Sequence, residues 1–186
     1  MLITKNEKME QNQQPGDLAT IEALINDLGS KDGIARQKAR NALVQIGLPA
    51  MESLTVAFET KKNAYAHWEA AKAISAIGGP EAVRPLLRAL SDDDFSIRWI
   101  ATEGPIAVGA IALESLAKVL VSEEPPPFFY ESSHHFIHDL VSKKIIDEEM
   151  VSQVEPLLKA FSKTASTQMI SQEAARFLDW LRTNRL

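Results

Sequence analysis

The sequence predicts an all-α fold, a right-handed α-solenoid of about five helical hairpins. Four glycines recur at intervals of 31 residues (47−16, 78−47, 109−78), each at a junction between similar pairs of apolar segments: Gly16, Gly47, Gly78 and Gly109. Small residues repeat at the same interval inside these segments: Ala39, Ala70 and Ala101. A repeat this short cannot bury its apolar face alone, so neighbouring repeats must stack and leave one long exposed surface.

The first three hairpins follow from apolar residues at helical spacing. They are predicted over residues 21–28 and 34–46, 51–58 and 70–77, and 83–90 and 97–109, with the turns GSKDG, TKKN and SDDD between the helices of each pair. Glycine can take the left-handed conformation that ends a second helix, and Pro49 and Pro80 suit the start of the next one. Pro105 is expected to kink the second helix of the third hairpin.

The last two hairpins are less regular. The fourth begins over 111–120, and three prolines in the turn SEEPPPFFYESS stop the helix until about Tyr130. This turn is expected to expose Phe128, Phe129 and Tyr130. The fifth hairpin is predicted over 151–161 and 173–181, and its last helix should cap the stack.

Three segments share an Asp-containing turn, an early arginine, an Ala-rich interior or a terminal glycine: Ser30 to Gly47, Gly78 to Leu90 and Ser91 to Gly109. In these features the chain resembles the HEAT-repeat proteins, in particular the short repeat type also found in phycobilisome bilin lyases. The resemblance covers residues 17–182 and implies a fold rather than one activity. The predicted organisation is a flexible N-terminal tail, residues 1–15, followed by a single HEAT-like domain, residues 16–186.

Composition limits the classes of partner. The net charge of −5 argues against nucleic acid as a partner, because affinity for phosphate backbones comes from clustered Lys and Arg. Charged residues interrupt every predicted helix, so we expect no membrane-spanning segment. The chain has no cysteine and no signal-peptide-like start, which favours a cytoplasmic location.

Polar and aromatic residues of the second helices point away from the alanine column and are expected to line the concave face. Trp68 and Trp99 occupy equivalent places in successive repeats and would form an apolar ledge for a partner, although packing between repeats also explains them. The predicted partner-binding residues are Trp68, Lys72, Trp99, Glu103, Glu131, His135 and His138. The predicted partner is a protein or peptide.

The segment ESSHHFIHD carries three of the four histidines of the chain. At helical spacing, His134, His135 and His138 with Glu131 could bind a divalent metal ion, and Glu103 could reach the same place. A solvated polar face explains the same residues, and no HEXXH motif is present. The sequence therefore leaves two readings open: no cofactor, or a metal on these side chains.

The function favoured by the sequence is a non-enzymatic interaction scaffold. One alternative is a metal-dependent enzyme or bilin lyase-like chaperone that uses the histidine cluster; the chain is similar in fold to deoxyhypusine hydroxylase but lacks its His-Glu pairs. Another alternative is a DNA-binding protein that resembles alkylpurine DNA glycosylases, with Arg36, Lys72 and Arg98 beside the tryptophans. The acidic net charge argues against this last alternative.

Overall fold

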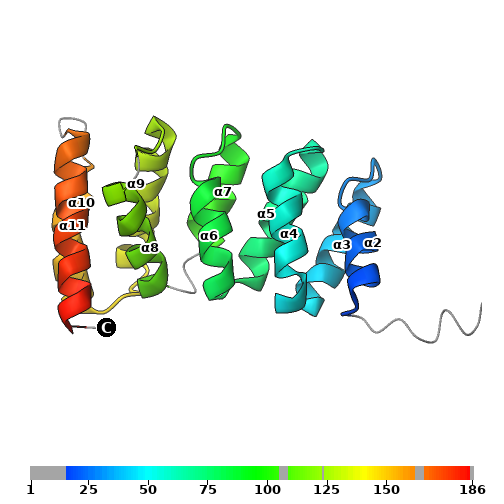
Figure 1. Cartoon of the computed structure of the whole chain (residues 1–186), viewed down its shortest axis with the longest axis horizontal. Helices are drawn as coiled ribbons and strands as arrows, with labels where there is room; N and C mark the ends of the chain where they lie inside the picture. Colours follow the sequence, from blue (N-terminus) through cyan, green and yellow to red (C-terminus); the bar gives the residue numbers. More distant parts are fainter. Residues whose placement is uncertain (1–15, 105–108, 123, 162–165, 185–186) are drawn as a thin grey trace, which may run out of the picture. The chain divides into compact units, whose positions relative to one another are not determined.

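The computed structural model describes residues 16–104, 109–122, 124–161 and 166–184 (Figure 1). These residues form ten α-helices and one short 3-10 helix, and no β-strand occurs among them. The predicted all-α fold of HEAT-like hairpins is therefore confirmed. The chain divides into two compact units, Met1–Ile77 and Gly78–Leu186, which we describe one at a time. Within the described ranges, no helix is both long and apolar enough to cross a membrane.

Two hairpins make up the first unit. Its helices are α2 (Leu18–Asp27), α3 (Gly33–Ile46), η1 (Leu48–Ala50), α4 (Met51–Thr60) and α5 (Ala64–Ile77). The first helices α2 and α4 pack together, and so do the second helices α3 and α5. Leu28, Leu43, Leu54 and Ile74 are buried at the core, and Ala39 and Ala70 are buried where the predicted small-residue column required close approach.

Turn chemistry follows the sequence prediction in this unit. The carboxylate of Asp32 accepts a hydrogen bond from the Ile34 N–H at 2.9 Å and caps α3. Gly47 ends α3 with φ = 74°, a backbone conformation that side chains with a Cβ rarely adopt. Pro49 then lies in η1, where its fixed φ and missing N–H suit a helix start.

The described residues of the second unit form six helices. They are α6 (Pro80–Ala89), α7 (Phe95–Glu103), α8 (Gly109–Ser122), α9 (Pro127–Ser142), α10 (Glu148–Ala160) and α11 (Thr167–Asn184). The first helices α6 and α8 pack together, and the second helices α7 and α9 pack together. The largest side chains at the core are fully buried: Leu86, Leu90, Ile97, Leu113, Leu116, Phe129, Phe136 and Phe177.

The fifth hairpin has the reverse order of the preceding ones. Its first helix, α10, packs beside the second helix α9, and its second helix, α11, packs beside the first helix α8 (Figure 1). The short connection from Lys143 to Asp147 folds α10 directly back on α9. Residues of α11 therefore do not continue the row of second-helix side chains that the sequence repeat predicts.

Two boundary predictions were wrong. The helix expected over 97–109 ends at Glu103, and Gly109 instead begins α8 with φ = 32°; the predicted kink at Pro105 lies outside the described residues. The helix expected to resume near Tyr130 begins at Pro127, because proline is well tolerated in the first helical turn. Phe129 is consequently buried inside the unit, while Phe128 remains exposed on the first turn of α9.

Candidate functional site

A groove runs between α7 and α9 in the second unit, with a volume of about 160 Å³. We call it the α7–α9 groove; its lining residues are Phe95, Arg98, Trp99, Thr102, Glu103, Glu131, Ser132, His135 and Asp139. Four of the predicted partner-binding residues are among them: Trp99, Glu103, Glu131 and His135. His138 does not line this groove.

Helix periodicity explains this convergence. Trp99 and Glu103 are one turn apart on α7, and Glu131 and His135 are one turn apart on α9, so each pair lies on one side of its helix. The carboxylate of Asp94 caps α7 by accepting a hydrogen bond from the Ser96 N–H at 2.8 Å.

The groove carries an exposed aromatic cluster at one end. Phe95 and Trp99 are 66% and 57% exposed, and their ring centroids lie 6.5 Å apart. The guanidinium of Arg98 lies 4.4 Å from the ring centroid of Phe128, across from α7 to α9, and 5.6 Å from that of Phe95. These contacts hold a cation between two exposed rings.

Arg98 also has a structural role that the sequence did not predict. Its Nη1 donates to the backbone carbonyls of Asp92 and Asp93 at 2.7 and 3.0 Å, which closes the SDDD turn. In the first unit, Arg36 does the same for Ser30 and Lys31, and its guanidinium lies 4.2 Å from the Tyr65 ring centroid. The recurring Asp turn followed by arginine was a sufficient signal for this function.

His67 occupies the equivalent place in the second hairpin and serves a similar purpose. Its Nδ1 lies 2.8 Å from the carbonyl oxygen of Phe58, and because a carbonyl only accepts, this nitrogen carries the proton. The imidazole also stacks on the Phe58 ring, with centroids 4.6 Å apart and planes inclined by 9°. His67 is therefore part of the turn structure of this hairpin.

Trp68 and Lys72 lie on α5 of the first unit. The Nζ of Lys72 is 4.1 Å from the ring centroid of Trp68, whose side chain is partly exposed. Burial and the nearby charge of Arg40 lower the pKa of Lys72, while Glu69 opposes this shift. Since Trp68 and Trp99 belong to different units, a continuous ledge formed by the two stays a prediction.

The three clustered histidines of α9 are close together but face different neighbours. The ring of His134 lies 5.9 Å from that of His135 and 6.4 Å from that of His138, and it also meets the edge of Phe161 at 6.2 Å. Burial, followed by the charges of the other two histidines, lowers the pKa of His134. Among the residues that the structure describes, no three His, Asp or Glu side chains are grouped as a metal ion would require. Metal binding by these residues stays a prediction.

Comparison with known proteins supports the fold. A family model for HEAT repeats matches residues 21–104, which cover α2 to α7 except the start of α2. A search of curated proteins found no significant match. The match does not distinguish the bilin-lyase type of repeat, which stays a prediction. Stacked hairpins, buried alanines and the family match agree, and the chain contains HEAT repeats over residues 21–104.

Proposed function

We propose that this protein is a non-enzymatic interaction scaffold that binds a protein or peptide on the second-helix face, with the α7–α9 groove as the principal contact. The observation that carries this proposal is the exposure of Trp99, a large aromatic side chain that lines the groove and is 57% exposed. Helical repeats in general present extended binding surfaces, which agrees with this function.

Burying an exposed tryptophan side chain in an interface lowers the free energy of the complex. Full burial of a large apolar side chain contributes about 1.5–3 kcal/mol, and Trp is among the residues most often found at the energetic centre of interfaces. Phe95 enlarges the apolar area around Trp99, and the guanidinium of Arg98 lies against the rings of Phe95 and Phe128. An apolar side chain of a partner would remove this cluster from water.

The charges around the groove indicate which residues of a partner would flank that apolar anchor. Glu103 and Glu131 are exposed along it, and Asp139 lines its end beside Lys143, whose Nζ is 2.7 Å from the carboxylate. An acidic rim favours Lys or Arg on the partner. We therefore propose a segment with one apolar anchor and adjacent basic residues as the ligand.

Trp68 and Lys72 remain proposed contacts on the first unit. Lys72 covers the Trp68 ring, so a partner would meet a cation and an aromatic edge there. His138, exposed on α9, also stays among the proposed contacts. The cytoplasmic location, the metal-dependent alternative and the DNA-binding alternative stay predictions from the sequence.

The test is Trp99→Ala in a peptide-array and pulldown assay with extract of the native host. We expect the variant to lose at least tenfold in affinity for peptides that combine an aromatic or aliphatic anchor with basic residues, while its circular dichroism spectrum stays unchanged. Met169→Ala, which truncates another exposed apolar side chain on α11, is the matched control. Equal binding by wild type and Trp99→Ala would refute the proposed site.

A further inference from the structure

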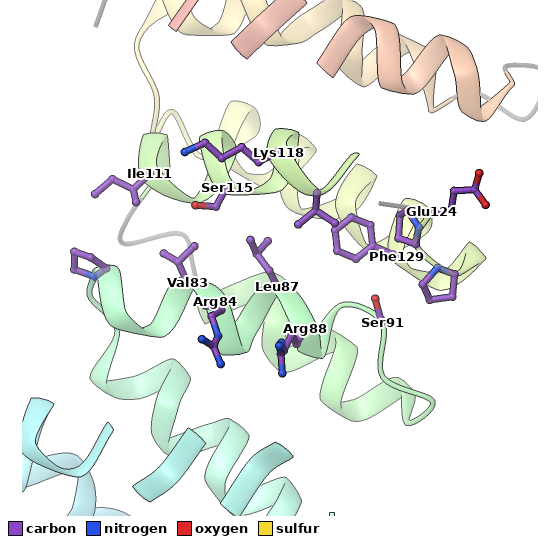
Figure 2. A pocket seen from close by; sticks show the side chains of 14 residues that line it. Val83, Arg84, Leu87, Arg88, Ser91, Ile111, Ser115, Lys118, Glu124 and Phe129 are labelled. Carbon is purple, nitrogen blue, oxygen red and sulfur yellow. The ribbon is translucent and has the colours of Figure 1, made fainter. Parts of the chain in front are cut away.

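A second and larger groove lies between α6 and α8 of the second unit, with a volume of about 610 Å³ (Figure 2). We call it the α6–α8 groove. It shares no lining residue with the α7–α9 groove. Its volume falls within the roughly 300–1,000 Å³ typical of ligand clefts.

The floor of the α6–α8 groove is apolar and largely buried: Val83 and Leu87 are only 4% and 6% exposed. Val83 and Leu87 are one helical turn apart on α6 and point toward α8 in Figure 2. Ile111 of α8 is 47% exposed at one end of the groove, and Phe129 of α9 closes the other end. The exposed apolar surface of the groove is therefore Ile111, with Val119 half-buried two turns further along α8, and it is suited to the apolar face of a helical segment.

The rim of the same groove is basic. Arg84 and Arg88 come directly after Val83 and Leu87 in the sequence of α6, and they are also one turn apart. Lys118 lies on α8, on the opposite side of the groove. Glu124 is the only acidic side chain among the lining residues. Three cationic side chains and one acidic side chain thus line the groove of a protein whose net charge is −5, although Lys118 pairs with Glu114, and Arg84 and Arg88 have partners within the protein as well.

We propose that the α6–α8 groove binds an acidic amphipathic helix of a partner protein. The apolar face of that helix would cover Ile111 and Val119 above the buried floor, and its Asp or Glu side chains would meet Arg84, Arg88 and Lys118. The spacing of two arginines one turn apart matches carboxylates one turn apart on the ligand. This surface is additional to the proposed α7–α9 contact, since its charge calls for an acidic ligand and not a basic one.

An acidic protein segment fits this groove better than a nucleic acid does. Nucleic acids are bound mainly through many clustered cations, whereas here three cations border an apolar floor. Peptide helices bring apolar and acidic side chains together at the required spacing.

The probe is a fluorescein-labelled synthetic helix of about 14 residues, with Leu at positions three and four apart and Glu beside them. Two matched peptides carry Lys in place of Glu, or Ser in place of Leu. We expect fluorescence anisotropy to show binding of the acidic Leu-containing peptide, with at least tenfold weaker binding of both matched peptides.

Lys118 permits a closely matched pair of protein variants. Lys118 is 58% exposed and pairs with Glu114 at 2.5 Å, while Lys159 on α10 is 73% exposed and pairs with Glu155 at 3.0 Å in the same i,i+4 arrangement. We expect Lys118→Glu to weaken binding of the acidic peptide about fivefold to tenfold, by loss of attraction and gain of repulsion, while Lys159→Glu leaves it unchanged. Ile111→Ser should weaken it as well, and Trp99→Ala should have no effect.

Circular dichroism melting identifies any variant that has lost its fold, so that the comparison uses folded proteins only. Three results would overturn the proposal: no binding of the acidic peptide, equal binding of the Lys-containing peptide, or equal effects of Lys118→Glu and Lys159→Glu. Tighter binding of a single-stranded oligonucleotide than of the acidic peptide, with steep salt dependence, would also overturn it in favour of a nucleic acid ligand.

Discussion

Arg40 of α3 donates a hydrogen bond to the Glu69 carboxylate of α5 across 2.6 Å, which joins the two hairpins of the first unit. The Nε of Arg36 lies 3.7 Å from the other carboxylate oxygen. The side chain of Glu69 is only 4% exposed, and those of the two arginines are 17% and 16% exposed. One buried acid thus balances two nearly buried cations.

Glu69→Ala should destabilise the first unit strongly, because it leaves both guanidinium groups without their carboxylate. Removing one partner of a buried ion pair costs about 3–5 kcal/mol, and partial exposure of the arginines places the expected loss at the lower end. Urea unfolding followed by circular dichroism measures this loss. Glu155→Ala, which breaks an exposed pair with Lys159, should cost less than about 1 kcal/mol. Equal losses in the two variants would contradict the buried role of Glu69.

Phe129→Ala and Phe128→Ala should differ greatly although the two residues are neighbours. Phe129 is buried, so its truncation leaves a cavity and should cost about 3–5 kcal/mol of unfolding free energy. Phe128 is 43% exposed and lies against Arg98, and its truncation should cost about 1 kcal/mol or less. Thermal and urea unfolding distinguish these outcomes, and similar costs would contradict the burial of Phe129 in the core.

Asp94→Ala should destabilise the second unit by about 1 kcal/mol, because the side chain caps α7 at the Ser96 N–H. Asp94→Asn keeps an oxygen acceptor and should retain most of that stability. Urea midpoints of the two variants test the cap directly. A loss in Asp94→Asn as large as in Asp94→Ala would show that charge, and not the cap, is what matters.

His134 should make stability depend on pH. Its pKa in the folded protein lies below the ordinary value of 6.5, owing to burial and then to the charges of His135 and His138. Between the folded and the ordinary pKa the unfolded chain therefore binds more protons, so the free energy of unfolding falls as pH is lowered through that window. The effect vanishes above the ordinary pKa and is constant below the folded one.

The variant His134→Gln removes this contribution. Between about pH 7.5 and pH 5 its urea midpoint should fall less than that of the wild type, whereas changes due to the carboxylates are common to both proteins. An identical pH dependence in the two proteins would refute the assignment to His134.

The metal hypothesis gives a separate prediction. If the α9 histidines bind zinc, elemental analysis should find one ion per chain, and added zinc should raise the melting temperature of the wild type but not that of His135→Ala. No bound metal and no change in melting temperature would refute it.

Repetition made most of the fold predictable. The periodic glycines and the alanine column fixed the first three hairpins, and Ala39, Ala70 and Ala101 are all buried as expected. Helical spacing also brought Trp99, Glu103, Glu131 and His135 into one groove. Local periodicity determines which side of a helix a residue occupies, and that was sufficient for these four positions.

Other features depend on packing between distant helices and could not be read from periodicity. The reversal of the fifth hairpin follows from the direct turn between α9 and α10, which the hydrophobic pattern does not encode. Phe129 belongs to the core because Pro127 starts a helix, whereas the proline run alone indicated an exposed loop. The basic α6–α8 groove was missed because its walls come from two first helices, which the sequence repeat treats as core.

The packing of α11 on α8 has a consequence for the nascent chain. During synthesis α8 leaves the ribosome well before α11 does, so the apolar surface on α8 that α11 later covers stays exposed until α11 has emerged. Most repeat arrays can fold hairpin by hairpin as they emerge. Here the contact between α8 and α11 spans α9 and α10, and contacts between residues far apart in the sequence form more slowly. We therefore expect the docking of α11 on α8 to be a slow step, during which the exposed surface of α8 is prone to aggregation.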